Sequence, residues 1–381
     1  MKKTDKRKLK ASTVLIRTAI CVFTALFLVV AFIFSGVAVI NYGPSKTARD
    51  LFVISMLETS AAKFLATWYF SPEDIDSILQ DNAVIADEGY SDPSLIDFGK
   101  NTTAETTDVY FPGETDEFYI ETDEPDTETT DNITYETEKD TETTQASSSG
   151  KTPYFKSDGI EIYDVSGSTF RGKMMIVSDP SRLSVGVSGD YSSGAPGKTL
   201  LAMADEYHAT AAINGGGFED TNGRGDGGTP IGLVITNGKL VYGGMDTYYD
   251  VIGFNKDNVF IVGNMTARQA LDRGIRDALA FGPVLVMNGK ASTVKGAGSG
   301  LNPRSAIGQR SDGAVLLLVI DGRQPSSLGA TYADLIDIMM DFGAINAANL
   351  DGGNSSSLYY KGSIVNKGLF LRGLPTCFIV K

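Results

Sequence analysis

The chain has 381 residues, of which 42% are hydrophobic, so it exceeds one average domain and can bury a sizeable core. Its formal net charge is −14, and residues 101–145 alone hold 15 acidic residues against one lysine. The remaining residues balance at 32 basic and 32 acidic, so the acidity belongs to one segment. A globular part without basic excess argues against nucleic-acid binding.

Cysteine usage also limits the options. The chain has two cysteines, and Cys21 lies inside an apolar run while Cys377 lies in the last strand-like segment. Two such residues exclude a disulfide framework. If the globular part is outside the cell, its stability must therefore come from core burial.

The N-terminal region is typical of a signal anchor. Residues 18–43 carry no charge, and Ala19–Ile40 is long and apolar enough for a transmembrane helix. Seven basic residues precede it, which predicts a cytoplasmic tail over residues 1–17 and a single-pass cell-membrane protein with its C-terminal part extracytoplasmic. The alternative is a cleaved signal peptide, whose apolar region is usually shorter.

Two segments separate this helix from the C-terminal region. Residues 44–98 are predicted to be a membrane-proximal helical segment, because residues 45–82 carry apolar residues at helical spacing. They would serve self-association, or form a helical hairpin near the headgroups. Residues 99–152 are an acidic Thr/Glu-rich stretch too polar to bury a core, which predicts a disordered linker acting as a spacer.

Residues 153–381 have the pattern of a folded domain. Short β-rich runs alternate with Asn-Gly and Asp-Gly turns, which predicts repeated hairpins over residues 231–242, 284–290 and 306–320. Three helices are expected near residues 199–207, 266–276 and 332–342. The predicted fold class is a mixed α/β (α+β) domain with antiparallel-rich sheets and a few packed helices.

The first candidate site follows an apolar strand and contains Asn214, Gly215 and Gly216. Glycines there let the backbone approach a ligand, and Asn214 can bond sugar hydroxyls or phosphate. A plain glycine turn is the alternative, and Glu219 is an outside candidate for catalysis. The nearby oxygen-rich residues Asp220, Asn222 and Asp226 faintly resemble a calcium loop, although Arg224 stands where a ligand is needed.

Arginines supply the candidate phosphate ligands. Arg304 and Arg323 flank a predicted hairpin, and Arg372 precedes the last strand. A guanidinium binds phosphate through two parallel hydrogen bonds, but a surface arginine paired with a carboxylate is the commoner case.

Two carboxylates follow apolar strands and are the main catalytic candidates. Asp321 ends the run Val315–Ile320, and Asp351 is followed by glycines and hydroxyls that include Gly352, Gly353 and Ser355. Such a pair is typical of glycosidases, which use two carboxyl groups. His208 is the single histidine and lacks a Gly-x-Ser-x-Gly partner motif, so it is interpreted as structural. No Cys/His cluster indicates zinc, and we expect no metal or other cofactor.

The domain resembles the phosphodiester glycosidase family, which is related to the enzyme that uncovers mannose-6-phosphate by removing N-acetylglucosamine. The resemblance covers roughly residues 154–381. It rests on the order and spacing of Asn214-Gly215-Gly216 with Phe218, residues 229–235, Gly282-Pro283, residues 304–308, residues 321–323 and residues 349–353 with the serines after them. The third glycine, Gly217, and Asn354 depart from the usual pattern.

This resemblance implies hydrolysis of a sugar-1-phosphodiester at the anomeric carbon, releasing free sugar and a phosphomonoester. Arg304 and Arg323, supported by Arg372, would bind the diester and balance the charge that grows on its oxygen. Asp351 is the first choice for nucleophile or base, ahead of Asp321 and Glu219. Asn214 would orient hydroxyl or phosphate groups.

Two alternatives stay open from the sequence. One is a non-catalytic module that binds an anionic wall glycan, and the other is a glycosidase that acts on a neutral glycan. In each case the expected partner is a cell-envelope polymer, such as a wall, capsule or exopolysaccharide chain.

Overall fold

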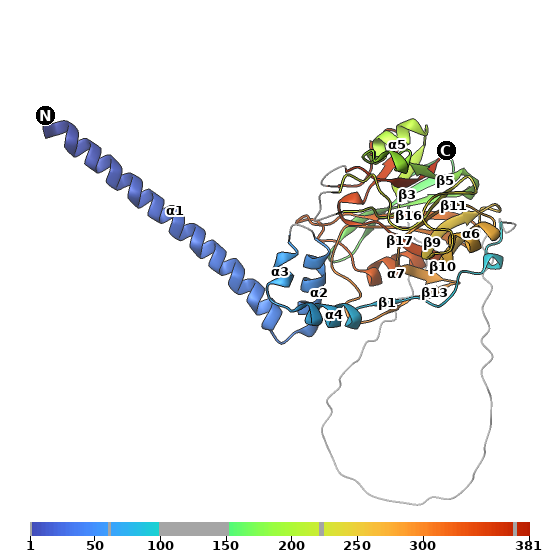
Figure 1. Cartoon of the computed structure of the whole chain (residues 1–381), viewed down its shortest axis with the longest axis horizontal. Coiled ribbons are helices and arrows are strands. Elements are labelled where there is room, and N and C mark those ends of the chain that lie inside the picture. The colour runs from blue at the N-terminus through green and yellow to red at the C-terminus, as the bar shows by residue number, and fades with distance from the viewer. Residues whose placement is uncertain (1, 60–61, 99–151, 221–224, 369–371) are drawn as a thin grey trace, which may run out of the picture.

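The structure, a computed structural model, describes residues 2–59, 62–98, 152–220, 225–368 and 372–381. A long helix, α1 (Lys2–Tyr42), projects from a globular body (Figure 1). Thr13–Tyr42 is long and apolar enough to cross a membrane, and almost none of it is buried. This helix is compatible with the predicted single-pass anchor.

The largest sheet has eight antiparallel strands and forms the centre of the body. The side chains of its strand β16 (Val315–Ile320) contribute to two cores in turn, because successive side chains point to opposite faces of the sheet. Leu316 and Leu318 pack beneath helix α7 (Tyr332–Asp341), whereas Leu317 and Val319 face the smaller sheets. In spatial order the strands are β13 (Lys290–Ala291), β12 (Val284–Met287), β17 (Ala344–Leu350), β15 (Arg304–Arg310), β16 (Val315–Ile320), β4 (Arg171–Val177), β3 (Ile160–Ser166) and β2 (Phe155–Ser157).

Two five-stranded antiparallel sheets complete the main core. Phe254 from one and Phe378 from the other meet in an edge-on ring contact with centroids 6.2 Å apart. The first sheet contains β10 (Phe260–Thr266), β9 (Tyr248–Asn255), β11 (Ile275–Ala280), β7 (Val234–Thr236) and β8 (Lys239–Tyr242). The second contains β19 (Ser363–Ile364), β18 (Leu358–Tyr360), β6 (Ala211–Asn214), β20 (Thr376–Val380) and β5 (Leu183–Val187).

The predicted fold class and the local elements are confirmed. The hairpin of β7 and β8 turns at Asn237 and Gly238, whose φ angles of 51° and 70° suit a tight left-handed turn. Thr331 and Asp334 form the capping box of α7. The other expected helices are α5 (Leu200–Glu206) and α6 (Ala267–Asp272).

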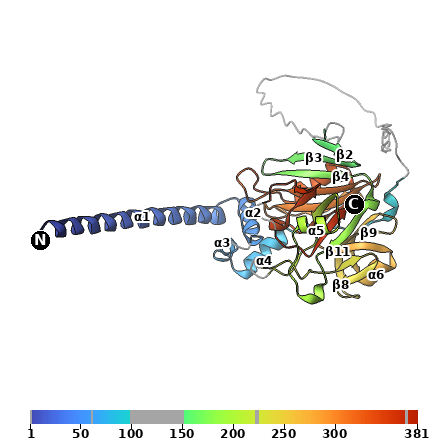
Figure 2. The same ribbon diagram turned by 90° about the horizontal axis from the view of Figure 1, so that it is seen from above.

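Residues 45–98 pack against the C-terminal domain. They form α2 (Lys46–Leu57), α3 (Phe64–Thr67), α4 (Pro72–Asp81) and β1 (Val84–Ile85), which pairs with β14 (Thr293–Val294). Ser55 accepts a hydrogen bond from the Leu301 amide at 2.9 Å, and Ile96 is buried in a domain core. The segment is helical over much of its length, as predicted, but it belongs to the globular body, and α2, α3 and α4 lie between α1 and the sheets (Figure 2).

The predicted disordered linker, residues 99–152, lies almost entirely outside the described residues. Its flanks are described, and both belong to the body. The Asp97 amide donates to the Ser311 carbonyl at 2.8 Å, and Phe155 packs on the main core. The residues on both sides of the linker therefore lie in one folded body, and its role as a spacer stays a prediction.

Candidate active site

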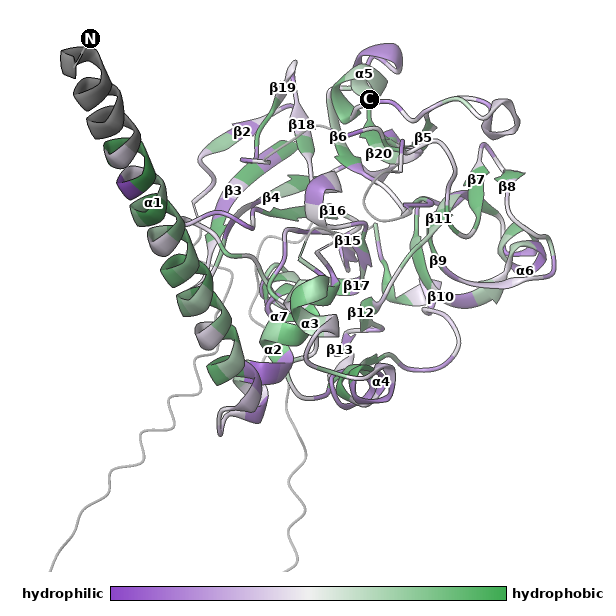
Figure 3. Ribbon diagram, turned by 60° about the vertical axis from the view of Figure 1, so that its left-hand side comes forward, coloured by the Kyte–Doolittle hydropathy of each residue, from purple (hydrophilic) through white to green (hydrophobic). Residues whose placement is uncertain are grey.

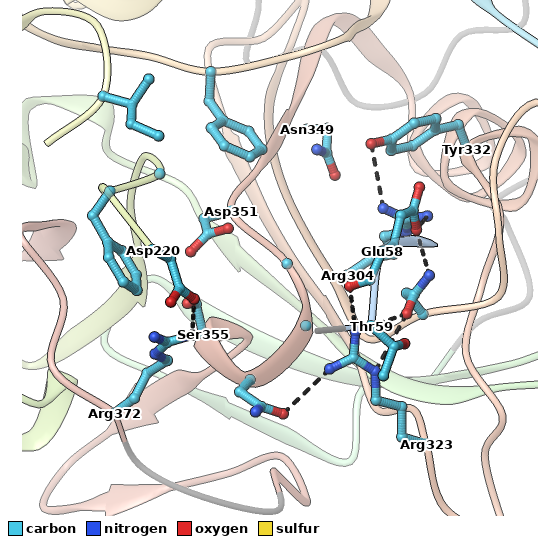
Figure 4. A pocket seen from close by; sticks show the side chains of 18 residues that line it. Glu58, Thr59, Asp220, Arg304, Arg323, Tyr332, Asn349, Asp351, Ser355 and Arg372 are labelled. Carbon is cyan, nitrogen blue, oxygen red and sulfur yellow. Dashed lines mark hydrogen bonds and ion pairs between the residues drawn. The ribbon is translucent and has the colours of Figure 1, made fainter. Parts of the chain in front are cut away.

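A cavity of about 540 Å³ opens where the first residue of β15 and the last residues of β6 and β17 meet. The cavity has charged and polar groups on two sides and aromatic rings on its wall (Figure 4). Its lining comprises Glu58, Thr59, Gly217, Phe218, Asp220, Ile231, Phe281, Asn302, Arg304, Arg323, Tyr332, Asn349, Asp351, Gly352, Gly353, Asn354, Ser355 and Arg372. The predicted carboxylate Asp351 thus shares one cavity with all three predicted phosphate ligands.

Asp351 follows β17 directly and is held by its backbone. Its amide donates to the Gly215 carbonyl at 3.0 Å, and its side chain accepts a hydrogen bond from Ser355. Burial raises the pKa of Asp351 to about 6, against the lowering effects of Ser355, Arg372 and the Gly352 amide. A carboxyl group that titrates near neutrality is suited to exchange protons during catalysis.

Asn214 bonds to the backbone of Asp351 and does not line the cavity. Its Nδ2 donates to the Asp351 carbonyl at 2.6 Å, and its Oδ1 accepts from Ser305 Oγ at 2.7 Å and from the Ser357 amide at 3.1 Å. The side chain is fully buried. Its protein partners occupy it, so the structure indicates a positioning residue and not the expected ligand of hydroxyl or phosphate.

We expect Asn214→Ala to destabilise the fold by about 2–4 kcal/mol, because three buried groups lose their partner. Urea unfolding would measure this loss, and Ser305→Ala is the matched control because it removes a single one of these bonds. If Asn214→Ala lowered the free energy of unfolding no more than Ser305→Ala, the stabilising role of the three Asn214 hydrogen bonds would be contradicted.

Arg372 and Asp220 form a second charged group beside Asp351. Their ion pair measures 2.9 Å, and the Arg372 guanidinium lies 4.5 Å from the centre of the Phe218 ring. Asp220 also accepts from the Gly225 amide at 2.7 Å. Both charged side chains are more than three-quarters buried, so the pair is well screened from water.

Asp220 therefore belongs to the cavity, whereas its neighbour Glu219 is exposed and does not line it. Side-chain alternation along an extended segment explains the difference, since adjacent residues point opposite ways. Within the described ranges, no group of three or more His, Cys, Asp or Glu side chains is arranged to hold a metal. Asn222 of the suggested calcium loop lies outside those ranges, so the calcium alternative stays untested.

Arg304 and Arg323 form a third group on the opposite side of the cavity. Arg304 is 5% exposed, and its Nη2 lies 2.8 Å from Glu58 Oε2. Its guanidinium also stacks 4.3 Å from the Tyr332 ring centre. Arg323 donates to the Glu58 carbonyl at 3.1 Å and to Asn302 Oδ1 at 2.9 Å. The sequence spacing did not show whether the two arginines share a pocket. The structure brings both of them into contact with Glu58.

Two glycines near these groups are required by geometry. Gly353 has a φ of 59° and lies against Arg323, so a Cβ there would be strained and 3.4 Å from the guanidinium. A Cβ on Gly215 would meet the Thr376 backbone at 2.8 Å. Gly216 donates its amide to Thr376 Oγ1 at 3.0 Å. Gly215 and Gly216 thus serve close packing, and it is Gly217, Gly352 and Gly353 that line the cavity.

Asp321 lies outside the cavity, which corrects its expected pairing with Asp351. Its Oδ1 accepts from the Lys367 amide at 2.8 Å and from Asn366 Nδ2 at 3.3 Å. The residue is 8% exposed and contributes to a separate small hollow. These bonds assign the carboxylate to holding the loop at residues 366–367.

The sequence did not single out several residues of the cavity. Asn349 belongs to the motif at residues 349–353 but was given no role, and its Oδ1 is buried without a partner among the described residues, while its Nδ2 donates to the Gly282 carbonyl at 2.8 Å. A buried amide oxygen on a cavity wall can accept a bond from a ligand hydroxyl. Phe281 and Tyr332 were also missed, and Glu58 comes from a segment almost 250 residues away from Arg304.

A partly buried carboxylate thus shares a polar cavity with three arginines, an arrangement that is compatible with hydrolysis. The family model of the phosphodiester glycosidases matches residues 207–381, which confirms the resemblance stated above. At the level of the family, this part of the chain is therefore similar to hydrolases of phosphodiester-linked sugars. The folded body begins well before the matched region, because β2, β3, β4 and β5 precede residue 207.

Two curated relatives also match parts of this chain. The SPbeta prophage-derived uncharacterized protein YomE of Bacillus subtilis (strain 168) is 31% identical over 239 residues, covering 56% of this chain and 35% of that protein. The N-acetylglucosamine-1-phosphodiester alpha-N-acetylglucosaminidase of Bos taurus is 23% identical over 186 residues, covering 44% and 34%. The chain thus spans about a third of the length of these curated relatives.

A solved structure is also similar. The catalytic domain of the zebrafish N-acetylglucosamine-1-phosphodiester alpha-N-acetylglucosaminidase matches with a TM-score of 0.49 and 20% identity, covering 60% of this chain and 86% of that one.

Proposed function

We propose that this protein is a membrane-anchored, extracytoplasmic hydrolase that cleaves the glycosidic bond of a sugar-1-phosphodiester. The observation that carries the proposal is the placement of Asp351 and three arginines in one cavity. The family match supports the reaction class. The apolar helix Thr13–Tyr42 and the basic residues before it support the anchor and its orientation.

In the proposed reaction the bond between the anomeric carbon and the phosphate oxygen breaks. The oxygen of water ends on the anomeric carbon, and the phosphate leaves as a phosphomonoester. Asp351 acts as carboxylate, either attacking the anomeric carbon or accepting the proton of water. Arg372 lies beside Asp351, and Arg304 and Arg323 lie across the cavity, so positive charge is available where the leaving oxygen becomes negative.

The remaining lining residues suit a sugar ring. Phe281 is partly exposed and offers an apolar face, and the unpartnered Asn349 Oδ1 is placed to accept a hydrogen bond from a hydroxyl. Arg304 already donates to Glu58 at 2.8 Å, so a phosphodiester oxygen must bind beside that contact or replace it. The substrate we propose is a glycosyl phosphodiester of the cell envelope.

Release of reducing sugar from a panel of sugar-1-phosphodiesters tests the proposal. The full-length protein in detergent is the correct sample, because Glu58 and Thr59 of the N-terminal segment line the cavity. The panel should include both anomers of N-acetylglucosamine, the sugar named for the bovine relative. Wall-polymer binding without any release, by folded protein, would favour the binding-module alternative.

The pH dependence of turnover offers a further prediction. Burial raises the pKa of Asp351 to about 6, and the proposed mechanism needs the carboxylate form. We therefore expect kcat/KM to rise with pH to a half-maximum near pH 6 and then to level off. A stopped assay over a series of buffers would measure it. An activity that falls with rising pH through this range would mean that the protonated group acts, as a general acid does.

A further inference from the structure

The end of the apolar helix is joined to the catalytic body by aromatic contacts. Tyr69 packs against Phe34 and Tyr42 of α1, with ring centres 5.6 Å and 6.0 Å apart. About 20 residues suffice to cross the hydrocarbon core of a bilayer, whereas Thr13–Tyr42 has 30. The uncharged run Ala19–Ile40 is long enough for such a span and ends two residues before Tyr42, so Tyr42 lies at the membrane surface and Tyr69 lies there beside it.

Helix α3 and the residue that caps its C-terminal end, which is next to Tyr69, expose aromatic side chains. Phe64 is 43% exposed and Trp68 is 69% exposed, and their ring centres are 4.7 Å apart. Trp68 is the single tryptophan of the chain. Tryptophan and tyrosine are the residues that concentrate at membrane interfaces, because their rings are apolar and their tips polar. In Figure 3 most of α1 and much of α2 and α3 are coloured as hydrophobic, with a hydrophilic stretch where α1 passes into α2.

The same segment forms one wall of the candidate active site. Glu58 and Thr59 line the cavity immediately after α2 and only a few residues before Phe64. Helix α2 has 12 residues, so it spans about 18 Å between the end of α1 and the cavity. Ser55 and Glu58 bond to the catalytic body, so this short link is fixed to it. The arginines therefore lie within about one length of α2, roughly 18 Å, of the end of α1.

We propose that α3 rests in the membrane interface and that the substrate is a sugar-1-phosphate esterified to an alcohol embedded in that membrane. This inference rests on the proposed function. The sugar would enter the cavity, the phosphate would lie at headgroup level beside Arg304 and Arg323, and the lipid chain would stay in the bilayer. Hydrolysis would break the bond between the anomeric carbon and oxygen, add water there, and leave a lipid phosphomonoester in the membrane.

Fluorescence of Trp68 tests the membrane contact without any substrate. The full-length protein is reconstituted into phosphatidylcholine and phosphatidylglycerol vesicles that contain lipid brominated just below the headgroup. Because bromine quenches indole at short range, we expect strong quenching that is lost when the bromine is moved to the ends of the acyl chains. Equal emission with and without brominated lipid would place Trp68 in water and overturn the inference.

Activity in the same vesicles tests the substrate class. Three diesters of the sugar-1-phosphate selected by the panel are compared: a soluble methyl diester, a polyprenyl diester and a diacylglycerol diester. We expect one or both lipid diesters to be hydrolysed about ten-fold faster than the methyl diester at equal concentration, because shared anchoring raises their local concentration. The faster of the two lipid diesters identifies the embedded alcohol.

Substitutions on α3 provide the matched variants. Trp68→Glu should lower turnover of the lipid diester about ten-fold and leave turnover of the methyl diester unchanged, because Trp68 does not line the cavity. Tyr248→Glu is the control, since Tyr248 is 62% exposed on β9 and away from this segment. Equal hydrolysis of lipid and methyl diesters would overturn the inference alone. Hydrolysis of none of the three would overturn the proposed function with it.

Discussion

Asp351→Asn is expected to lower kcat by about a thousand-fold, the typical loss when a catalytic acid-base group is removed. The amide keeps the size of the side chain and its contact with Ser355, but it can neither attack the anomeric carbon nor accept a proton from water. Initial rates of sugar release by the full-length protein would measure the loss. Binding of the diester should persist, because the arginines are untouched. Retained turnover would remove Asp351 from the mechanism.

The effect of Asp351→Asn on stability shows whether a loss of activity comes from a loss of folding. Burial raises the pKa of Asp351 to about 6 in the folded protein, above the value of the unfolded chain, so the folded state binds the proton more tightly. Its stability contribution is therefore present below about pH 4 and is lost as pH rises through about 6. Asp351→Asn should then be more stable than the unmodified protein by about 1–3 kcal/mol at pH 8 and similar to it at pH 4. Thermal unfolding at the two pH values would show this difference.

Arg304→Ala is expected to lower kcat/KM for a phosphodiester by about 30-fold or more, corresponding to a loss of about 2 kcal/mol or more for a buried charged contact. Arg304 is 5% exposed and lines the cavity, so a cation from the solvent does not easily take the place of its guanidinium. The measurement is the rate at substrate concentrations below KM. A glycosidase for neutral glycans would lose little activity, so this variant separates the two mechanisms.

Glu58→Gln is the matched control for Arg304→Ala. It removes the same ion pair, which measures 2.8 Å, but leaves the guanidinium in place and without its anionic partner. If Arg304 binds the substrate phosphate, Glu58→Gln should keep or increase kcat/KM, because no carboxylate competes for the cation. If Arg304 acts only by holding Glu58, the two variants should lose activity alike. Urea unfolding of both variants shows whether either loss is one of stability.

Local chemistry explains why much of the fold was predictable. The turn at Asn237-Gly238 and the cap at Thr331 depend on residues within four positions of each other, and both occur as predicted. Asp351 could be predicted as a site residue because it directly follows a buried strand and is itself followed by glycines. The chemistry of the guanidinium group made the three arginines candidates, but they lie in or near strands of two different sheets and only the tertiary structure brings them into one cavity.

Distant contacts explain what the sequence did not reveal. The Glu58–Arg304 pair joins residues 246 positions apart, and no spacing rule reports such a contact. Asp321 and Asp351 both end buried strands, but the Lys367 amide draws the Asp321 carboxylate away from the cavity. Asn214 was expected to contact substrate, yet its partners Ser305 and Ser357 come from other parts of the chain. The direction in which a polar side chain points at the end of a strand therefore depends on residues that are distant in the sequence.

The central claim is that water attacks the anomeric carbon and not phosphorus. Hydrolysis in ¹⁸O-labelled water, with ³¹P NMR of the phosphomonoester, tests it directly, because bound ¹⁸O shifts the phosphorus resonance. Reading the label on phosphate avoids the slow oxygen exchange of a free reducing sugar. We predict a phosphomonoester that contains no ¹⁸O. A label on the phosphate would show cleavage of the phosphorus–oxygen bond and would contradict the proposed glycosidase mechanism.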